Sequence, residues 1–354
     1  MEQNEIYAAL PGVLLPWYEK NARDLPWRHT KEPYRVWVSE IMLQQTRVEA
    51  VIGYYERFME AFPTVQALAE ADEARVLKLW EGLGYYSRAR NLQKTAKLLT
   101  ETQNGAFPDT AEALEKLPGI GAYTAGAVAS ICFEQPAAAV DGNVLRIIMR
   151  INTRRRGAAG RPIDLPQVKK EIGEALCKVY PKGHCGAFTQ ALMELGACVC
   201  TPKSPKCEVC PTQSFCRAYT AGNVTKYPVK RPKAAKKTEE RTVLLLECNG
   251  RFAVEKRSKT GLLAGLWQFP NVPQKLDAQI AVQTAQSFHT DPKELMLETH
   301  KTHIFTHIRW EMTGYVIRCN AMSEAFTWAS LAEIEHDFAL PTAFRQFSDE
   351  LKTL

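Results

Sequence analysis

The sequence contains no membrane-length apolar run and no secretory signal. None of its hydrophobic stretches approaches the roughly 18 residues that a membrane-spanning helix needs. The first seven residues, MEQNEIY, lack the basic-then-apolar order of a signal peptide. We therefore expect a cytoplasmic protein with no membrane partner. Repeats with a period of roughly 20 to 50 residues are also absent, which argues against a solenoid.

Length and composition indicate a folded protein of about two domains. Hydrophobic residues make up 45% and charged residues 24% of the 354 residues, which argues against a disordered or fibrous chain. A chain of this length exceeds what one hydrophobic core usually organises. The formal net charge of +6 suits an anionic partner but does not by itself identify nucleic acid.

A basic segment divides the chain. From Val224 to Arg241, seven basic side chains stand against two acidic ones, with two prolines and no apolar periodicity. This composition is typical of an exposed linker, and its charge suits a phosphate backbone. We expect domains at 1–223 and 241–354 joined by a linker at 224–240. The basic residues are Lys226, Lys230, Arg231, Lys233, Lys236, Lys237 and Arg241.

The two halves differ in periodicity. From Val36 to Phe62, apolar residues recur mostly three and four positions apart, which predicts a helical stripe. Further helices are expected to follow Asp72, Tyr86 and Thr110. After the linker, short segments rich in β-branched and aromatic residues occur at 242–248, 252–255 and 309–317. The first half should be mostly α, and the second a sheet with a helix or two.

Four of the ten cysteines crowd into a loop at 200–216. They stand in C-x6-C-x2-C-x5-C order, as Cys200, Cys207, Cys210 and Cys216. Four thiolates in one compact loop can hold a metal ion or an iron–sulfur cluster, and composition alone does not separate iron from zinc. Buried free thiols are the alternative. The spacing resembles the cluster loop of the endonuclease III superfamily of DNA glycosylases, which implies a [4Fe-4S] cluster.

A glycine-containing turn joins two expected helices. Gly119 and Gly121 lie in the sequence LPGIG, directly before a segment of small apolar residues at 122–131. Outward backbone N–H groups and the start of a new helix favour an anion there. A helix C-cap followed by a turn is the structural alternative. The turn also resembles the helix-hairpin-helix motif of the same superfamily, at about 112–132.

Two acidic residues are candidates for breaking an N-glycosidic bond. One carboxyl group can protonate the leaving base, while another stays ionised beside the sugar cation. Glu40 is expected early in its helix at the edge of the apolar stripe, where partial burial favours its protonated form. A glutamate complementing the helix dipole is its alternative role. Asp141 has the pattern of a helix N-cap, a role compatible with an ionised catalytic carboxylate.

Six segments together resemble the adenine DNA glycosylase (MutY) family over nearly all of residues 15 to 220. The resemblance implies a multidomain protein: a mostly α helix-hairpin-helix glycosylase domain with an iron–sulfur loop, followed by an α+β MutT/Nudix-like domain. The matching segments are RDLPWR from Arg23, SEIMLQQT from Ser39, GLGYY from Gly82, LPGIGAYT from Leu117, VDGNV from Val140 and the four-cysteine loop.

The resemblance implies roles for four residues of the catalytic domain. Glu40 would be the general acid toward N7 of adenine and the base that handles water, and Asp141 would stabilise the oxocarbenium ion. Tyr123 stands where strand-cutting relatives carry a Schiff-base lysine, so a monofunctional enzyme is expected. Tyr123 and Asn143 would line the base pocket, although Tyr123 could instead be an aromatic on the helix surface.

The same resemblance implies contacts with duplex DNA by a monomer. Adenine inside a duplex must be extruded, and inserted side chains can offset the unstacking cost. Gln45 and Tyr85 match the family's inserted residues. An aromatic packed at a helix start is the alternative for Tyr85. The other implied DNA-binding residues are Arg28, Thr46, Gly119 and Gly121.

Residues 241–354 resemble the family's MutT-like domain for recognising 8-oxoguanine. The sequence GLWQFP from Gly265 looks like the strand before a Nudix box, but no acidic Arg-Glu-x-x-Glu-Glu run follows Pro270, so hydrolase activity is not expected. Phe305, Thr306 and His307 resemble a Phe-Ser-His loop, with threonine replacing serine. A metal cluster of the nearby histidines is disfavoured because no acidic or cysteine partner is in register.

Two other functions remain open at this point. The nearest is a bifunctional endonuclease III-like enzyme that acts on oxidised pyrimidines. The other is a non-catalytic DNA-damage sensor whose cluster reports redox state. The paired carboxylates and Tyr123 favour the hydrolytic removal of adenine mispaired with 8-oxoguanine or guanine.

Overall fold

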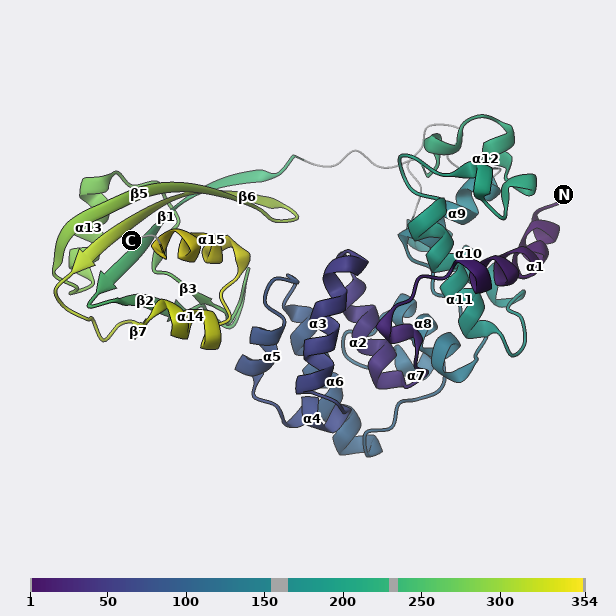
Figure 1. Cartoon of the computed structure of the whole chain (residues 1–354), viewed down its shortest axis with the longest axis horizontal. Coiled ribbons are helices and arrows are strands. Elements are labelled where there is room, and N and C mark those ends of the chain that lie inside the picture. The colour runs from purple at the N-terminus through teal and green to yellow at the C-terminus, as the bar shows by residue number, and fades with distance from the viewer. Residues whose placement is uncertain (1, 154–164, 229–234, 353–354) are drawn as a thin grey trace. The chain divides into compact units, whose positions relative to one another are not determined.

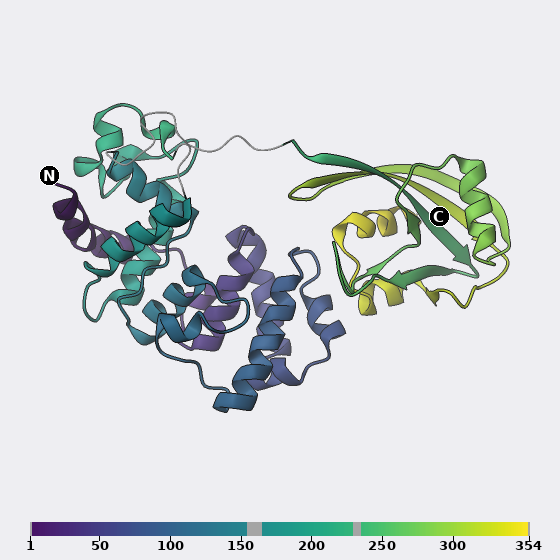
Figure 2. The same ribbon diagram turned by 180° about the vertical axis from the view of Figure 1, so that it is seen from behind.

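The computed structural model describes residues 2–153, 165–228 and 235–352 (Figures 1 and 2). The chain forms two compact units, one of Met1–Glu70 with Asn91–Pro232 and one of Ala71–Arg90 with Lys233–Leu354. The segment 71–90, expected in the catalytic half, thus groups with the C-terminal half. Of the expected linker residues, Lys230, Arg231 and Lys233 lie outside the described residues.

The first unit is helical. Its α-helices are α1 Gln3–Asn21, α2 Pro33–Leu43, α3 Val48–Ala61, α4 Val65–Glu70, α6 Ser87–Gln103, α7 Ala111–Leu114, α8 Ala122–Phe133, α9 Gly142–Ile151, α10 Leu165–Cys177, α11 Cys185–Glu194 and α12 Arg217–Thr220, of which α6 begins in the second unit. Its short turns of helix are η1 Pro26–Arg28, η2 Leu195–Val199, η3 Cys207–Val209, η4 Gln213–Phe215 and η5 Val224–Lys226.

Local signals explain where several of these helices begin. The Thr110 side chain accepts the Ala113 N–H at the start of α7, as an N-cap residue does. The Asp141 side chain caps α9 in the same way. Apolar residues of α1, α9, α10 and α11 then form one core, in which Leu10, Ile172 and Phe188 are completely buried. This core fixes the start of α9 and the end of α11, where candidate functional side chains lie.

The apolar stripe from Val36 to Phe62 is not one helix. It is divided between α2 and α3 by a turn in which Gln45 has a left-handed φ of 61°. The expectation that Glu40 lies early in its helix was therefore wrong: the helix begins at Pro33, and Glu40 lies near its C-terminal end. A role in complementing the positive helix terminus is excluded by this position.

The second unit packs helices on both faces of a mixed sheet. Its elements are α5 Glu73–Leu79, β1 Lys237–Cys248, β2 Arg251–Lys256, β3 Trp267–Gln268, β4 Asn271–Val272, α13 Ala278–Ser287, β5 Pro292–Ile304, β6 Ile308–Cys319, β7 Thr327–Ala329, α14 Leu331–Asp337 and α15 Thr342–Leu351. The strand order is β3-β2-β1-β6-β5, with β4 on β1 and β7 on β2. Strands β1 and β6 are parallel, and the other pairs are antiparallel.

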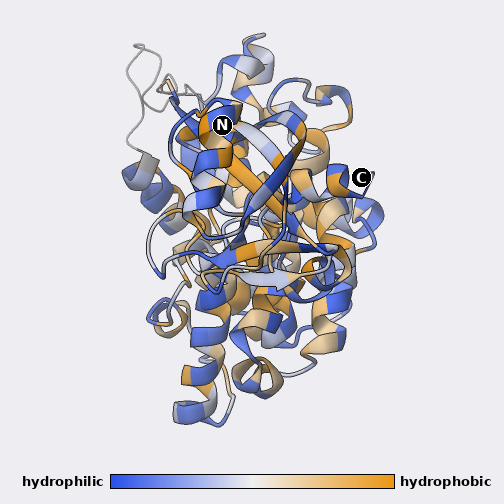
Figure 3. Cartoon of the chain, turned by 90° about the vertical axis from the view of Figure 1, so that its left-hand side faces the viewer, coloured by the Kyte–Doolittle hydropathy of each residue, from blue (hydrophilic) through white to orange (hydrophobic). Residues whose placement is uncertain are grey.

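Alternate residues of β1 serve two cores. Val243 and Leu245 pack with α14 and α15, whereas Leu244 and Leu246 pack with α13 on the opposite face. This is the two-residue period of a strand buried on both sides. Figure 3 shows apolar stretches along the strands of this sheet. The long hairpin of β5 and β6 is therefore part of a sheet that is packed by helices on both faces.

Three elements differ from expectation. Strand β1 begins at Lys237, inside the segment expected to be linker. Strand β5 was not predicted, because Pro292–Ile304 is rich in charged and polar residues and is largely exposed along its length. Helix α1 also lacked a prediction. Within the described residues, no helix has the length and apolar character needed to cross a membrane.

Candidate active site and DNA-contact residues

All four of the expected catalytic residues line one cavity in the first unit. The cavity has a volume of about 180 Å³ and brings together segments as far apart in the sequence as Arg23 and Ala197. Glu40 enters it from α2, Tyr123 from α8, and Asp141 and Asn143 from the start of α9. Two acids that are remote in sequence therefore face the same space.

Glu40 is buried and poised to titrate near neutrality. Only 4% of the residue is exposed, and its Oε2 accepts a hydrogen bond from the Tyr123 hydroxyl at 2.7 Å. Burial raises the pKa of Glu40 to about 7; the Tyr123 hydrogen bond and the Arg28 charge oppose this rise, while the Asp141 charge adds to it. The same burial, with the nearby carboxylates, raises the pKa of Tyr123 well above its usual value. The Tyr123 hydroxyl therefore keeps its proton and remains the hydrogen-bond donor to Glu40.

Asp141 is oriented by three N–H donors. Its Oδ1 accepts from the backbone N–H groups of Asn143 and Val144 at 2.8 and 2.7 Å, and its Oδ2 accepts from the Asn143 side-chain amide at 2.7 Å. All three contacts suit a carboxylate rather than a carboxylic acid. The expected N-cap role is confirmed, and it leaves the carboxylate at the cavity wall.

A turn of π-helix supports Asn143 from behind. Gly196 in η2 comes so close that a Cβ atom there would lie 2.6 Å from the Asn143 Cβ. Arg146 donates to both the Asn143 Oδ1 and the Gly196 carbonyl oxygen at 2.8 Å. A π-helical turn of this kind is often found at functional sites. The backbone of Gly196 therefore helps to fix the amide that orients Asp141.

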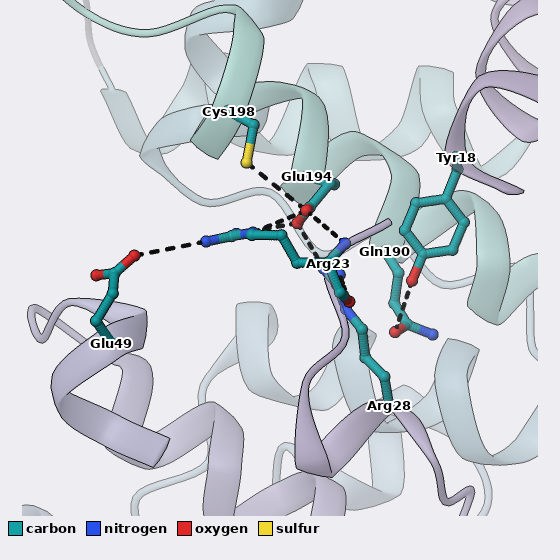
Figure 4. Close-up of polar contacts among 7 residues, drawn as sticks. All are labelled: Tyr18, Arg23, Arg28, Glu49, Gln190, Glu194 and Cys198. Carbon is teal, nitrogen blue, oxygen red and sulfur yellow. Dashed lines mark hydrogen bonds and ion pairs between the residues drawn. The ribbon is translucent and has the colours of Figure 1, made fainter. Parts of the chain in front are cut away.

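A buried ionic cluster in the same wall was missed by the sequence reasoning. The Glu194 carboxylate has a fully buried side chain and pairs with Arg23 and Arg28 (Figure 4). Only 12% of the Arg28 side chain is exposed, and its guanidinium lies over the Tyr18 ring, 5.4 Å from the centroid. The expected DNA-binding residue Arg28 thus lies in the wall of the base-sized cavity.

The glycine turn presents exposed backbone at the start of α8. Gly119 has a φ of +75°, and a Cβ there would lie 2.6 Å from the Asn91 Cβ, so both conformation and space favour glycine. Gly121 is the N-cap of α8, and both glycines are exposed. The Ile120 N–H closes the turn on the Leu117 carbonyl oxygen at 3.1 Å. This is the helix, hairpin and second helix expected from the sequence.

The residues expected to enter the DNA stack share an unusual backbone. Gln45 has a φ of 61° and is exposed between α2 and α3, whereas its neighbour Thr46 lines the cavity. In the second unit, Tyr85 has a φ of 47° and is 47% exposed. Left-handed φ values are uncommon outside glycine and cluster at functional sites. Each of these side chains is presented at the tip of a turn.

Tyr85 contacts the loop predicted to recognise 8-oxoguanine. Its hydroxyl lies 2.7 Å from the Thr306 Oγ1, and Phe305, Thr306 and His307 line the same cavity of about 530 Å³ in the second unit. The three residues form the tip of the β5–β6 hairpin, where Thr306 and His307 are exposed. Phe305 packs edge-on against Trp310, with 4.7 Å between ring centroids, and anchors the tip.

The four loop cysteines line one small cavity. Cys200 accepts an N–H from Arg150 at 3.3 Å, and that arginine is only 1% exposed. Arg150 also donates to the Thr201 and Pro202 carbonyl oxygens and so fixes the start of the loop. The described residues nevertheless include no group of three or more potential ligands already arranged to hold a metal ion. The loop thus gathers four free thiols at one place.

The fold is that of a helix-hairpin-helix base excision repair glycosylase. Residues 38–161 match the HhH-GPD superfamily of base excision DNA repair proteins, and residues 241–350 match the NUDIX domain. A solved thermostable thymine-DNA glycosylase is 29% identical, with a TM-score of 0.55, over 62% of this chain and 98% of that one. A non-covalent Endonuclease III–DNA complex, 24% identical over 63% of this chain and 98% of that one, has the same fold with a TM-score of 0.52.

The chain belongs to the adenine DNA glycosylase family. It is 34% identical to the adenine DNA glycosylase of Mus musculus over 96% of this chain and 78% of that protein. The enzyme of Buchnera aphidicola subsp. Schizaphis graminum is also 34% identical, over 96% of this chain and 98% of the relative. The Arabidopsis thaliana enzyme is 37% identical over 84% of this chain, which spans about half (55%) of that longer relative.

Proposed function

We propose that this chain is a monofunctional DNA glycosylase that hydrolyses the N-glycosidic bond of adenine mispaired with 8-oxoguanine or guanine in duplex DNA. The observation that carries the proposal is the single cavity shared by Glu40 and Asp141. Membership of the adenine DNA glycosylase family supports the choice of base. The product is an abasic site.

Glu40 supplies the proton that the leaving base needs. A carboxyl group with a pKa of about 7 is substantially protonated near neutral pH and can still give up its proton, which suits a general acid. In the proposed reaction the proton passes from Glu40 to N7 of the extruded adenine as the bond to the sugar breaks. The resulting carboxylate then accepts a proton from the water that adds to the sugar.

Asp141 supplies the negative charge beside the sugar. The oxocarbenium ion that forms as the base departs is stabilised by a nearby carboxylate that is already oriented. The three donors from Asn143 and Val144 hold that carboxylate in place before the substrate arrives. Little reorganisation is then needed when the positive charge develops.

The absence of a lysine nucleophile supports hydrolysis without strand cleavage. The position that would carry the amine is Tyr123, whose hydroxyl is committed to Glu40. The described residues lining the cavity include arginines but no lysine. A lyase mechanism through a Schiff base lacks its nucleophile here, so we disfavour the bifunctional endonuclease III-like alternative.

Recognition of duplex DNA is proposed for the exposed turns. Gln45 and Tyr85 would fill the stack that the extruded adenine leaves, and an aromatic stacking on a base contributes about 1–3 kcal/mol, comparable with the unstacking cost. The N–H groups of the turn at Gly119 and Gly121 would hold a phosphate. Thr306 and His307 would contact 8-oxoguanine opposite the adenine, with the Thr306 hydroxyl keeping the donor and acceptor functions of serine.

We also propose a [4Fe-4S] cluster held by Cys200, Cys207, Cys210 and Cys216. The shared cavity and the N–H group that Arg150 directs at the Cys200 sulfur fit thiolate ligands of a cluster. When bound, the group would cross-link the loop that follows η2. Iron and acid-labile sulfide in equal amounts, four of each per chain, are expected in the anaerobically purified protein. Stoichiometric zinc without sulfide would contradict the proposal.

The test of the proposed function is base release from defined duplexes. The protein is incubated with duplexes that carry adenine opposite 8-oxoguanine, guanine, cytosine or thymine, and free adenine and strand breaks are measured before and after alkali. We expect adenine release from the first two duplexes and breaks only after alkali. Breaks without alkali, together with a DNA adduct trapped by borohydride, would support the bifunctional alternative. Absence of release from every duplex would support the sensor.

A further inference from the structure

Glu194 has a set of contacts that a surface glutamate does not have. It ends α11, its side chain is fully buried, and its carboxylate accepts four N–H groups from a segment 166 to 171 residues away in sequence (Figure 4). Arg23 contributes its backbone N–H at 3.1 Å and two guanidinium N–H groups at 2.8 and 3.0 Å. Arg28 contributes one at 2.7 Å.

These contacts hold a stretch of chain that has little regular structure of its own. Residues 22–25, between α1 and η1, form no helix or strand, so their position depends on tertiary contacts. Arg28 also donates to the Arg23 carbonyl oxygen at 2.9 Å, which closes the stretch on itself. Glu194 is thus the point where backbone and both guanidinium groups converge. Removing its charge would loosen one wall of the cavity.

The cavity wall is close to electrical balance because of Glu194. The charges of Arg23 and Arg28 are matched by those of Glu194 and Asp141, all of which line the cavity. Glu49 also faces Arg23 at 3.9 Å, but it is 79% exposed and therefore strongly screened by water. Water screens charges less inside the cavity, so the loss of one charge changes the electrostatic energy of the others.

We propose that Glu194 is a positioning residue for the glycosylase reaction, holding Arg23 and Arg28 in the cavity wall and balancing their charge so that Glu40 keeps its proton. The inference rests on the proposed function. The groups that face Glu40 are Tyr123 and Cys132 of α8, Asp141 before α9, and Arg28 of η1. Those that face Glu194, besides the two arginines, are Tyr18 of α1 and Cys198 of η2.

The direction of the effect follows from the sign of the charges. Among the influences on the Glu40 pKa, burial is the largest and raises it, while the positive charge of Arg28 lowers it. Glu194 partly cancels that positive charge. Neutralising Glu194 exposes Glu40 to an uncompensated cation, which favours the ionised form of Glu40. The general acid then loses its proton at a lower pH.

The experiment measures single-turnover adenine release against pH for the full chain, at enzyme concentrations that saturate the duplex. For Glu194→Gln we expect the fall in rate at high pH to occur about one pH unit earlier than in the wild type, with roughly a tenfold lower rate above neutrality. At pH values below the midpoints of both rate profiles, any remaining loss of rate reports the loosened wall alone and should be smaller than the loss above neutrality. Glu194→Asp keeps the charge and should restore most of the wild-type midpoint.

Glu134→Gln is the matched control. Glu134 also joins distant segments, accepting from Lys31 Nζ at 2.9 Å and from the Cys185 N–H at 2.7 Å, but it is not one of the described residues that line the cavity. Its neutralisation should leave the pH midpoint unchanged. In case Glu194→Gln does not fold, Arg28→Gln provides a second measurement, because removal of the cation should move the midpoint upward.

The outcomes separate this inference from the proposed function. A wild-type protein that releases no adenine would refute the proposed function itself. The inference would be overturned if the wild type is active and Glu194→Gln has the same pH midpoint, with its rate reduced by the same factor at every pH. That result would show a purely structural role for Glu194. A wild-type midpoint in Arg28→Gln would overturn it as well.

Discussion

The raised pKa of Glu40 makes a quantitative prediction for the pH dependence of adenine excision. With a pKa of about 7, the carboxyl group is about 90% protonated at pH 6, about half at pH 7 and about 10% at pH 8. If Glu40 must donate a proton, the single-turnover rate should fall roughly tenfold between pH 6 and pH 8. A carboxyl group with the ordinary pKa of 4.5 would already be almost fully ionised at pH 6.

The assay follows adenine release under single-turnover conditions, so that product dissociation does not limit the rate. Duplex binding is measured at each pH by titration with a duplex that contains a non-hydrolysable adenosine analogue. Binding that stays saturated while the rate falls assigns the pH dependence to the chemical step. A rate that stays constant or rises from pH 6 to pH 8 would refute the assignment of Glu40 as the proton donor.

Three further predictions concern the same residues. Asp141→Asn should abolish excision while folding is retained, because asparagine caps helices about as well as aspartate; normal turnover, with circular dichroism as the folding control, would leave only the cap role. Glu40→Gln should raise the free energy of unfolding at pH 8 by about 1–3 kcal/mol, and by much less below pH 4.5. The reason is that ionisation of the buried Glu40 carboxyl group lowers the stability of the wild type as pH rises from 4.5 to about 7. Denaturant titrations at both pH values measure this difference, and an equal effect at both would contradict it. Thr306→Ala combined with His307→Ala should reduce the preference for 8-oxoguanine over guanine opposite adenine, and an unaltered ratio of the two excision rates would discredit the loop assignment.

Local chemistry explains what the sequence could predict. Asp72, Thr110 and Asp141 lie directly before their helices, where a short polar side chain accepts the exposed N–H groups, and all three act as N-caps. The strand at 242–248 was recognisable from its β-branched and apolar residues. These signals come from neighbours in the chain and require no knowledge of the rest of the fold.

The break between α2 and α3 shows where such signals fail. The apolar period continues through Val48 and Val51 as though the helix did, and the left-handed turn is made by Gln45 rather than by glycine or proline. A left-handed φ is uncommon outside glycine, so residue preference at Gln45 gives no signal of this turn. The position of Glu40 in its helix was misjudged for this reason, although its burial was anticipated.

Glu194 could not have been found from the sequence. In the segment Leu192–Leu195 it has the spacing of an ordinary helical glutamate, and nothing nearby indicates its partners. Its partners Arg23 and Arg28 lie 171 and 166 residues away, and they are near it because the core of α1, α9, α10 and α11 brings the two segments together. Complete burial was the decisive signal, and it is a property of the fold.

The most direct test of the account is excision by Glu40→Gln on a duplex with adenine opposite 8-oxoguanine. The variant keeps the shape of the side chain but has no acidic proton to transfer to the base. We therefore expect no measurable adenine release in a single turnover, while duplex affinity stays near that of the wild type. Adenine release at the wild-type rate would show that the buried carboxyl group at the centre of the cavity does not carry the reaction.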